Sequence, residues 1–169
     1  ANARVGSTTV LYREENKYYI AEENLDNLTF TEDGQYFIMS SEKNGYSHLY
    51  LYSMSGKEIQ PITSGKYDVV NFYGYDPAKK LYYYASHEES PLEKYVYSID
   101  LKGKKKKLTP TKGWNEAEFS KSFKYYINTV SNADMPPVYT LYAANGKAVR
   151  TLEDNAALKT KLEEYPVAK

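Results

Sequence analysis

The residues Gly45-Tyr-Ser47-His-Leu49 form the closest match in the chain to the G-x-S-x-G motif. That motif builds a sharp turn between a strand and a helix, and the turn lifts a nucleophilic serine above a sheet. Here Leu49 replaces the last glycine, and the leucines and tyrosines that follow predict a strand where the motif requires a helix. We therefore interpret Asn44-Gly45 as a hairpin turn before a strand that begins at Ser47-His48, and we predict no catalytic residue in this chain.

The chain has two histidines, His48 and His87, and no cysteine. The histidines do not show a metal-ligand spacing, and the absence of cysteine excludes disulfides and thiolate metal sites. His48 shares a strand face with Tyr50 and Tyr52, so we expect it to be packed or at the surface, whereas His87 lies in a polar loop and is expected to be solvated. The sequence predicts no metal site and no cofactor.

Two pairs of adjacent carboxylates, Glu14-Glu15 and Glu22-Glu23, offer a second kind of chemistry. Two carboxylates close together can hold one ammonium group through charge-assisted hydrogen bonds. Charged side chains in loops are, however, mostly solvent-exposed. We interpret both pairs as exposed loop carboxylates.

Residues 102–107 contain five lysines around one glycine, and Trp114, the only tryptophan, follows soon after. Such a lysine run can bind polyanions, but lysines at a hairpin turn also protect a strand edge from unwanted pairing. We favour the solvated turn and protected edge. We interpret Trp114 as a packing anchor between two repeats rather than as a platform for a ligand.

Composition restricts the class of protein. Lys plus Arg and Asp plus Glu number 22 each, so there is no net basic charge and we expect no nucleic-acid partner. No apolar run reaches the roughly 18 residues of a membrane span, so no membrane partner is expected. The first residues, Ala1-Asn2-Ala3-Arg4, lack the features of a signal peptide, so we expect any export signal of a longer parent to lie upstream. The 20 tyrosines favour β-structure.

An internal repeat organises the chain. Residues 30–41, 75–86 and 119–130 each begin with an aromatic residue, cross a short polar turn and enter an aromatic run. A second pattern follows each of these, and it ends in a polar residue, a glycine and a lysine, with the glycines at Gly56, Gly103 and Gly146. X-Gly-Lys between alternating runs indicates a hairpin, and we expect positive φ at these glycines. Short last strands are expected at 58–63, 105–109 and 148–152.

Four strands in each of three repeats predict an all-β fold, a partial β-propeller of about three four-stranded antiparallel blades with a short C-terminal helix. The alternative is a generic β-sandwich, which also has frequent turns. We expect the blades at 25–66, 67–111 and 112–152. Residues 1–24 are expected to end a truncated preceding blade through a hairpin of strands 8–14 and 17–21. Residues 153–169 are expected to form a helix, capped by Asp154 or Asn155, and a linker.

Several segments resemble one known family. Residues 30–34 and 41–52, Tyr82-Tyr-Tyr-Ala-Ser86, Pro136-Pro-Val-Tyr-Thr-Leu-Tyr142 and Leu152-Glu-Asp-Asn-Ala-Ala-Leu158 are similar to the N-terminal propeller of the dipeptidyl peptidase IV family, of the prolyl oligopeptidase class. The resemblance covers about residues 10–162, and it is closest in style to bacterial, Bacteroides-like members. The paired glutamates of that family follow an aromatic motif that is absent here, so their role is not assigned to Glu14-Glu15 or Glu22-Glu23.

The resemblance implies a function for the parent protein. Family members have an eight-bladed propeller that caps a C-terminal α/β-hydrolase domain, and they release N-terminal Xaa-Pro or Xaa-Ala dipeptides with a Ser-Asp-His triad. This chain would be roughly the last three blades, a non-catalytic part that gates access and scaffolds the active site, inactive alone. The implied partners are the hydrolase domain and the peptide substrate, and the implied location is periplasmic or secreted. The alternative is a binding-only periplasmic propeller for protein–protein interaction. Because the ends of a partial propeller lack neighbours, we also expect possible self-association.

Overall fold

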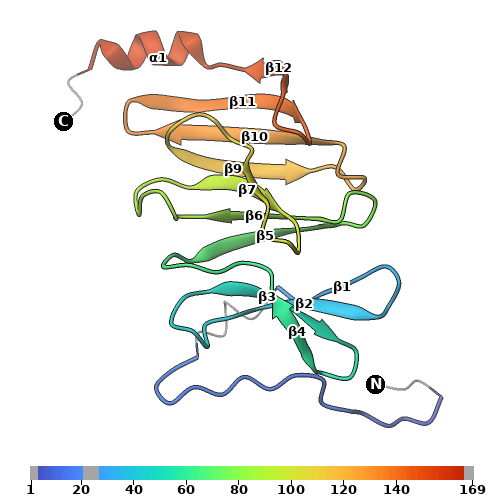
Figure 1. The fold of residues 1–169 in the computed structure, drawn as a ribbon. Helices are drawn as coiled ribbons and strands as arrows, with labels where there is room; N and C mark the ends of the chain where they lie inside the picture. The colour runs from blue at the N-terminus through green and yellow to red at the C-terminus, as the bar shows by residue number, and fades with distance from the viewer. Residues whose placement is uncertain (1–3, 21–26, 166–169) are drawn as a thin grey trace. The chain divides into compact units, whose positions relative to one another are not determined.

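The computed structural model describes residues 4–20 and 27–165. In these two ranges, three four-stranded antiparallel sheets and one short helix make up the regular structure (Figure 1). The chain divides into two compact units, Ala1–Val69 and Val70–Lys169, which are described separately here. The fold prediction of three four-stranded antiparallel sheets with a C-terminal helix is confirmed.

Within each sheet the strands follow one another in chain order, which is the arrangement that short hairpin turns produce (Figure 1). The first unit holds one sheet, with strands β1 (Thr29–Phe30), β2 (Tyr36–Ser41), β3 (His48–Ser53) and β4 (Glu58–Pro61). The second unit holds two sheets. They consist of β5 (Val69–Asp76), β6 (Leu81–Ser86), β7 (Tyr95–Ile99) and β8 (Lys105–Lys107), and of β9 (Trp114–Phe119), β10 (Tyr125–Asn132), β11 (Met135–Ala143) and β12 (Ala148–Glu153).

The turn between the third and fourth strand of each sheet is the same in all three repeats. Gly56, Gly103 and Gly146 have φ values of 81°, 80° and 83°. In each turn the glycine amide donates a hydrogen bond to the carbonyl three residues earlier, at 2.9, 3.0 and 2.8 Å. A non-glycine residue pays a steric cost at such φ values. The prediction of equivalent turns with positive φ is therefore confirmed.

The fourth strands of the first two sheets end earlier than predicted, at Pro61 and Lys107. Beyond these ends, a threonine hydroxyl in each sheet bonds a backbone amide of the neighbouring strand. The hydroxyl of Thr63 accepts a hydrogen bond from the amide of Leu49, and that of Thr109 accepts one from the amide of Val96, each at 3.0 Å. Both threonines are buried, so these two hydroxyls satisfy backbone donors in the interior.

Both faces of the first unit's sheet are buried, and an aromatic cluster covers one of them. Phe37 and Tyr52 stack with ring centroids 5.1 Å apart, and Tyr50 packs beside them. Leu11 and Tyr12, from the segment before the sheet, cover this cluster, and the ring of Tyr12 meets that of Tyr52 edge-on at 5.1 Å. Offset and edge-to-face pairs of this kind stabilise a core beyond simple area burial.

The predicted hairpin of strands 8–14 and 17–21 is wrong for the residues that the structure describes, because residues 4–20 contain no strand. Leu11 and Tyr12 pack on a sheet face instead of pairing along its edge. The backbone of this segment also passes close to a turn, since a side chain at Gly56 would overlap the carbonyl oxygen of Leu11. Strand propensity in a short segment was therefore overridden by packing.

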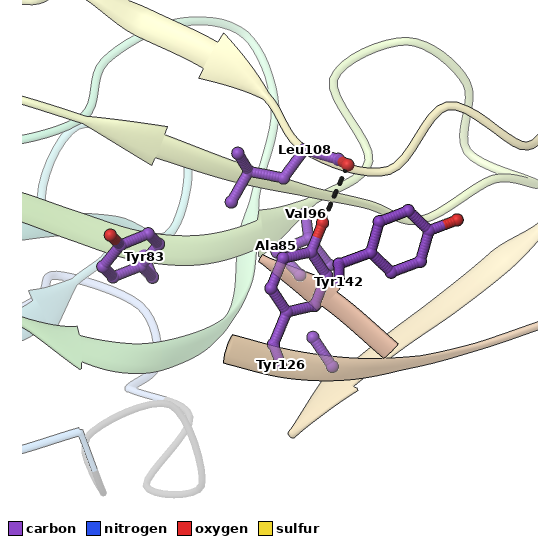
Figure 2. Close-up of a cluster of buried hydrophobic side chains, with 7 residues drawn as sticks. Tyr83, Ala85, Val96, Leu108, Tyr126 and Tyr142 are labelled. Atoms are coloured by element: carbon purple, nitrogen blue, oxygen red, sulfur yellow. Dashed lines mark hydrogen bonds between the residues drawn. The ribbon is translucent and has the colours of Figure 1, made fainter. Parts of the chain in front are cut away.

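The core of the second unit joins its two sheets (Figure 2). Tyr126 and Tyr142, from β10 and β11, stack with centroids 5.2 Å apart, and the hydroxyl of Tyr126 donates a hydrogen bond of 2.9 Å to the carbonyl of Leu108. Burial of the Tyr126 ring raises the pKa of its hydroxyl above the usual value, so the group stays a donor. The other buried members of this cluster are Tyr83, Ala85, Val96 and Ala117.

The C-terminal helix α1 (Ala156–Glu163) agrees with the prediction of a short helix after the last strand. Asn155, at its N-cap, has a left-handed backbone and makes no side-chain cap bond, but its amide group donates to the carbonyl of Pro137 at 2.6 Å. Asp154 instead accepts a hydrogen bond from the amide of Ala156 at 3.0 Å. Over residues 4–20 and 27–165, none of the helical structure has the length and apolar character that a membrane crossing needs.

Candidate functional site

The near-match to a nucleophile elbow is a hairpin connection. β2 ends at Ser41 and β3 begins at His48, and Gly45 between them has a φ of 87°. Ser47 is buried, and its amide donates a 2.7 Å hydrogen bond to the carboxylate of Asp68. The prediction of a turn followed by a strand is confirmed, with the strand starting one residue after Ser47.

Both nitrogens of the His48 ring have partners inside the first unit. Nδ1 lies 3.1 Å from the hydroxyl of Thr63, and Nε2 lies 3.1 Å from the carbonyl of Gly65. A carbonyl can only accept, so Nε2 carries the hydrogen and Nδ1 accepts from the threonine. The ring is buried and packs edge-on against Tyr67 at 5.2 Å, so the expectation of a packed His48 is confirmed.

The two carboxylates of Glu14 and Glu15 have different partners and different exposure. Glu14 is half-buried and accepts a 2.8 Å hydrogen bond from the hydroxyl of Ser41, so the interpretation of an exposed carboxylate is wrong for this residue. Glu15 is exposed and lies 3.8 Å from the guanidinium of Arg13. The second pair, Glu22-Glu23, lies outside the described residues.

The structure brings two other singled-out residues together in the second unit. The rings of His87 and Trp114 lie 5.2 Å apart, and the Nδ1–H of His87 donates to the carbonyl of Glu93 at 2.8 Å. His87 is half-buried, so the expectation of a solvated histidine is wrong. Trp114 packs on its neighbours but is 45% exposed, so it anchors this region through only part of its surface.

Lys94 is the centre of this group, and only 3% of its side chain is exposed. Its ammonium forms an ion pair with Glu116, lies 3.3 Å from the amide oxygen of Asn71 and sits 4.7 Å from the centre of the Trp114 ring. A buried ammonium requires such partners, because an unpaired charge in the interior is costly. The residues His87, Asn71, Lys94, Trp114 and Glu116 are called the Lys94 cluster below.

Backbone contacts fix the Lys94 cluster between the two sheets of the second unit. The amide of Lys94 donates to the carbonyl of Gly113 at 3.1 Å, and the amide of Asn115 donates to the carbonyl of Lys94 at 3.1 Å. The buried side chain of Asn115 bonds the same Lys94 carbonyl at 2.9 Å, and it accepts from the side chain of Asn128 at 2.9 Å. These contacts hold the start of β7 against the start of β9.

The accessible part of the Lys94 cluster is one carboxylate and one indole. The Glu116 side chain is 50% exposed, and its Oε1 receives both Lys94 and the indole N–H of Trp114, the latter at 3.2 Å. Such a surface can bind a ligand through hydrogen bonds and ring contact, but it supplies no nucleophile. Among residues 4–20 and 27–165 no group of three or more acidic or histidine side chains is arranged to hold a metal ion.

Sequence reasoning missed Lys94 and Glu116. Nothing in the local pattern marks Lys94 as buried, because lysine is almost always exposed. The run that follows, Tyr95-Val-Tyr-Ser-Ile99, predicts a strand but gives no sign that the lysine before it is buried. Nothing in the sequence marks Glu116 as the partner of a buried lysine. It alternates with buried residues along β9, as an ordinary solvent-facing strand residue does.

The lysine run lies where the sequence predicted, at the β7–β8 turn and along the edge strand β8. The interpretation of a simply solvated turn is incomplete, because Lys105 pairs with Glu88 and Lys107 lies 2.8 Å from Glu89. The ammonium of Lys107 also sits 3.4 Å from the centre of the Tyr95 ring. Hydrogen bonding to Lys107 lowers the pKa of Glu89 below its usual value, although partial burial opposes the shift.

Comparison with known proteins identifies the family. A family model described as the dipeptidyl peptidase IV (DPP IV) N-terminal region matches residues 1–137. The chain is 35% identical over 136 residues to a probable dipeptidyl peptidase 4 of Emericella nidulans and 33% identical over 138 residues to one of Aspergillus fumigatus. These alignments cover 77% and 78% of this chain but only 17% and 18% of the relatives, so the chain spans less than a fifth of their length.

Solved structures agree with this result. The crystal structure of Porphyromonas gingivalis dipeptidyl peptidase 4 matches with a TM-score of 0.83 and 44% identity, over 89% of this chain and 21% of that one. A putative dipeptidyl aminopeptidase IV from Bacteroides ovatus shares the fold, with a TM-score of 0.66 and 22% identity over 75% of this chain and 21% of that one. The three sheets are therefore a partial β-propeller, and the chain belongs to the dipeptidyl peptidase IV N-terminal region family.

Proposed function

We propose that this chain is a non-catalytic part of the propeller of a dipeptidyl-peptidase-IV-like serine exopeptidase. The longer polypeptide would release N-terminal Xaa-Pro or Xaa-Ala dipeptides, with its catalytic triad in a C-terminal α/β-hydrolase domain. The propeller part would limit access to that active site and support it, with a peptide as the substrate. The observation that carries the proposal is the match of residues 1–137 to the N-terminal region of this family.

The chemistry of the near-elbow supports a non-catalytic role. A serine nucleophile needs an adjacent base and donors for the oxyanion. Ser47 is buried, and both ring nitrogens of His48 are engaged with Thr63 and Gly65. The neighbouring histidine therefore has no free nitrogen with which to take a proton from the serine.

The division of the chain belongs to the same proposal. Residues 1–24 would complete a preceding blade, residues 25–66, 67–111 and 112–152 would be three blades, and residues 153–169 would lead toward the hydrolase domain. The protein would act in the periplasm or outside the cell. The exposed surface of α1, which has no buried residue, supports contact with a further part of the polypeptide.

A peptidase assay tests the proposal. The chain alone should hydrolyse Xaa-Pro-nitroanilides no faster than buffer, and a longer polypeptide that contains it should hydrolyse them at an enzymatic rate. Turnover by the chain alone that is lost in Ser47→Ala would contradict the non-catalytic role. A longer polypeptide without any exopeptidase activity would favour the alternative, a propeller used only for protein–protein interaction.

A further inference from the structure

A groove in the second unit lies between strand β8 and the β11–β12 turn. It has a volume of about 640 Å³, and residues from both sheets line it: Lys106, Lys107, Leu108, Thr109, Pro110, Asn145, Gly146 and Lys147. The two walls are tied together, because the ammonium of Lys106 donates a 2.7 Å hydrogen bond to the carbonyl of Asn145. The groove is therefore defined by contacts between the sheets rather than by one loop.

The floor of the groove is held by hydrogen bonds and close packing. Leu108 is buried, and its carbonyl is held by the hydroxyl of Tyr126 at 2.9 Å. Gly146 lies directly against it, since a side chain at this glycine would come within 3.3 Å of the Leu108 carbonyl oxygen. The Thr109 hydroxyl is fixed by the amide of Val96.

The charge of the groove is positive and only partly neutralised. Of its three lysines, Lys107 is paired with Glu89, but Lys106 and Lys147 have no carboxylate partner among the described residues. The lining itself contains no acidic residue. Lys106 uses one of its three hydrogens on Asn145, so two remain, and the exposed amide group of Asn145 adds further donors. The groove thus presents donors and two uncompensated positive charges.

We propose that this groove binds a phosphate monoester, and the test below distinguishes a small soluble carrier from a lipid. A phosphate monoester carries a charge of about −1.5 to −2 at pH 7, which two ammonium groups match. Lysines bind phosphate as point charges, and they need no exact fork geometry. The lining has no aromatic ring on which a nucleic-acid base could stack, so single-stranded nucleic acid is a poorer fit. This inference does not depend on the proposed peptidase function.

The test compares two double variants of the full chain. Glycerol 3-phosphate is titrated and followed by ³¹P NMR, and phosphatidic acid in vesicles offers the same monoester from a lipid source. Lys106→Gln/Lys147→Gln should weaken binding of either form by about tenfold, which corresponds to the loss of charged hydrogen bonds. The control, Lys121→Gln/Lys159→Gln, removes the same charge from two exposed positions that do not line the groove and should bind as the parent chain does.

The pH dependence gives a second readout. The second proton of a phosphate monoester binds with a pKa of about 6, so affinity should fall between pH 7.5 and 5.5, whereas binding of sulfate should stay constant. Equal weakening in both double variants would show attraction to net charge only and would overturn the proposal. So would the absence of saturable binding of both the soluble and the lipid-borne monoester.

Discussion

Glu58 and Lys105 occupy the same position in successive repeats, two residues after the turn glycine, and they carry opposite charges. Each is paired with a loop residue of its own sheet. Glu58 pairs with Lys43 of the β2–β3 connection, and Lys105 pairs with Glu88 of the β6–β7 connection. The first two repeats therefore share one ion pair between the loop that joins the second and third strands and the fourth strand, with the two charges exchanged.

The first prediction tests this contact in the first unit. Lys43→Glu and Glu58→Lys should each destabilise the protein, because like charges would then face each other. The double variant should recover most of the loss. Since both side chains are about one-third exposed, the coupling energy should be only about 0.5–1 kcal/mol in a urea double-mutant cycle. A coupling energy of zero would mean that the ion pair between Lys43 and Glu58 does not contribute to stability.

The second prediction compares two turn glycines with the same backbone. Gly56 and Gly103 have φ values of 81° and 80°, but a side chain would meet Leu11 only at Gly56, and nothing lies within 4 Å at Gly103. Gly103→Ala should cost about 1 kcal/mol from backbone strain alone. Gly56→Ala should cost clearly more, because the segment that contains Leu11 must move.

Urea unfolding of the two alanine variants measures this difference. Removing residues 1–12 deletes the obstructing carbonyl, so the two substitutions should then cost nearly the same. Equal costs in the full chain would show that the segment does not pack on the turn as the structure has it.

The third prediction concerns Asp76, which is buried at the end of β5. Its carboxylate accepts bonds from the amides of Ala78 and Lys79 and from the Lys79 ammonium at 2.8 Å. Burial alone would raise the pKa of Asp76, but the interactions with Lys79 and Ala78 outweigh it and hold the pKa below its usual 3.8. A lowered pKa in the folded state contributes stability above pH 3.8, and that contribution is lost as the pH falls through the lowered value.

Asp76→Asn should therefore be less stable than the parent chain at pH 7, by about 1 kcal/mol or less because Lys79 is half exposed. The difference should shrink below pH 3.8. Thermal unfolding followed by circular dichroism at pH 7 and pH 2.5 measures it. A difference that is the same at both values would rule out the charged form of Asp76 as its source.

The fourth prediction separates the two partners of the ion pair in the Lys94 cluster. Glu116→Ala leaves a buried ammonium with a lost partner and should cost about 1–3 kcal/mol. Lys94→Met fills the same space and leaves only a half-exposed carboxylate, so it should cost less, about 1 kcal/mol at most. In the double variant the extra cost of Glu116→Ala should disappear.

Glu118→Ala, on the same strand and also exposed, is the matched control and should be nearly neutral. Trp114 is the only tryptophan, so its fluorescence reports on this cluster alone. Its emission should change in the Lys94 and Glu116 variants and not in Glu118→Ala. Equal losses of stability for Lys94→Met and Glu116→Ala would contradict the conclusion that the buried Lys94 ammonium depends on Glu116 as its partner.

The repeat was readable from sequence because its signals are local. Gly56, Gly103 and Gly146 each supply a backbone conformation that other residues resist, and each ends an alternating run, so turn and strand are specified by neighbours in the chain. The burial of Lys94 was not readable, because its partners Asn71 and Glu116 are more than 20 residues away in sequence.

The predicted hairpin in the N-terminal segment was wrong for a related reason. Its alternation around Leu11 and Tyr12 favours a strand, but a strand also needs a free edge with which to pair. In the structure the two side chains cover Phe37 and Tyr52 instead. The groove beside Lys106 and Lys147 likewise could not be foreseen, since it requires knowing that the β8 edge and the β11–β12 turn meet.

The last prediction concerns self-association. Strand β12 is exposed along its whole length and forms the edge of its sheet, and helix α1 buries none of its residues. Their apolar side chains are each at least 40% exposed: Val149, Leu152, Leu158 and Leu162. An apolar surface of this kind next to a free strand edge favours association.

Light scattering should therefore show a mass that rises with concentration into the tens of micromolar. Leu158→Glu/Leu162→Glu should keep the chain monomeric, because it places charge one helical turn apart on the same face of α1. Lys159→Glu/Thr160→Glu alters charge on the same helix without touching these leucines and serves as the control. A parent chain that stays monomeric over this range would mean that the exposed surface of β12 and α1 is too small to hold a second copy.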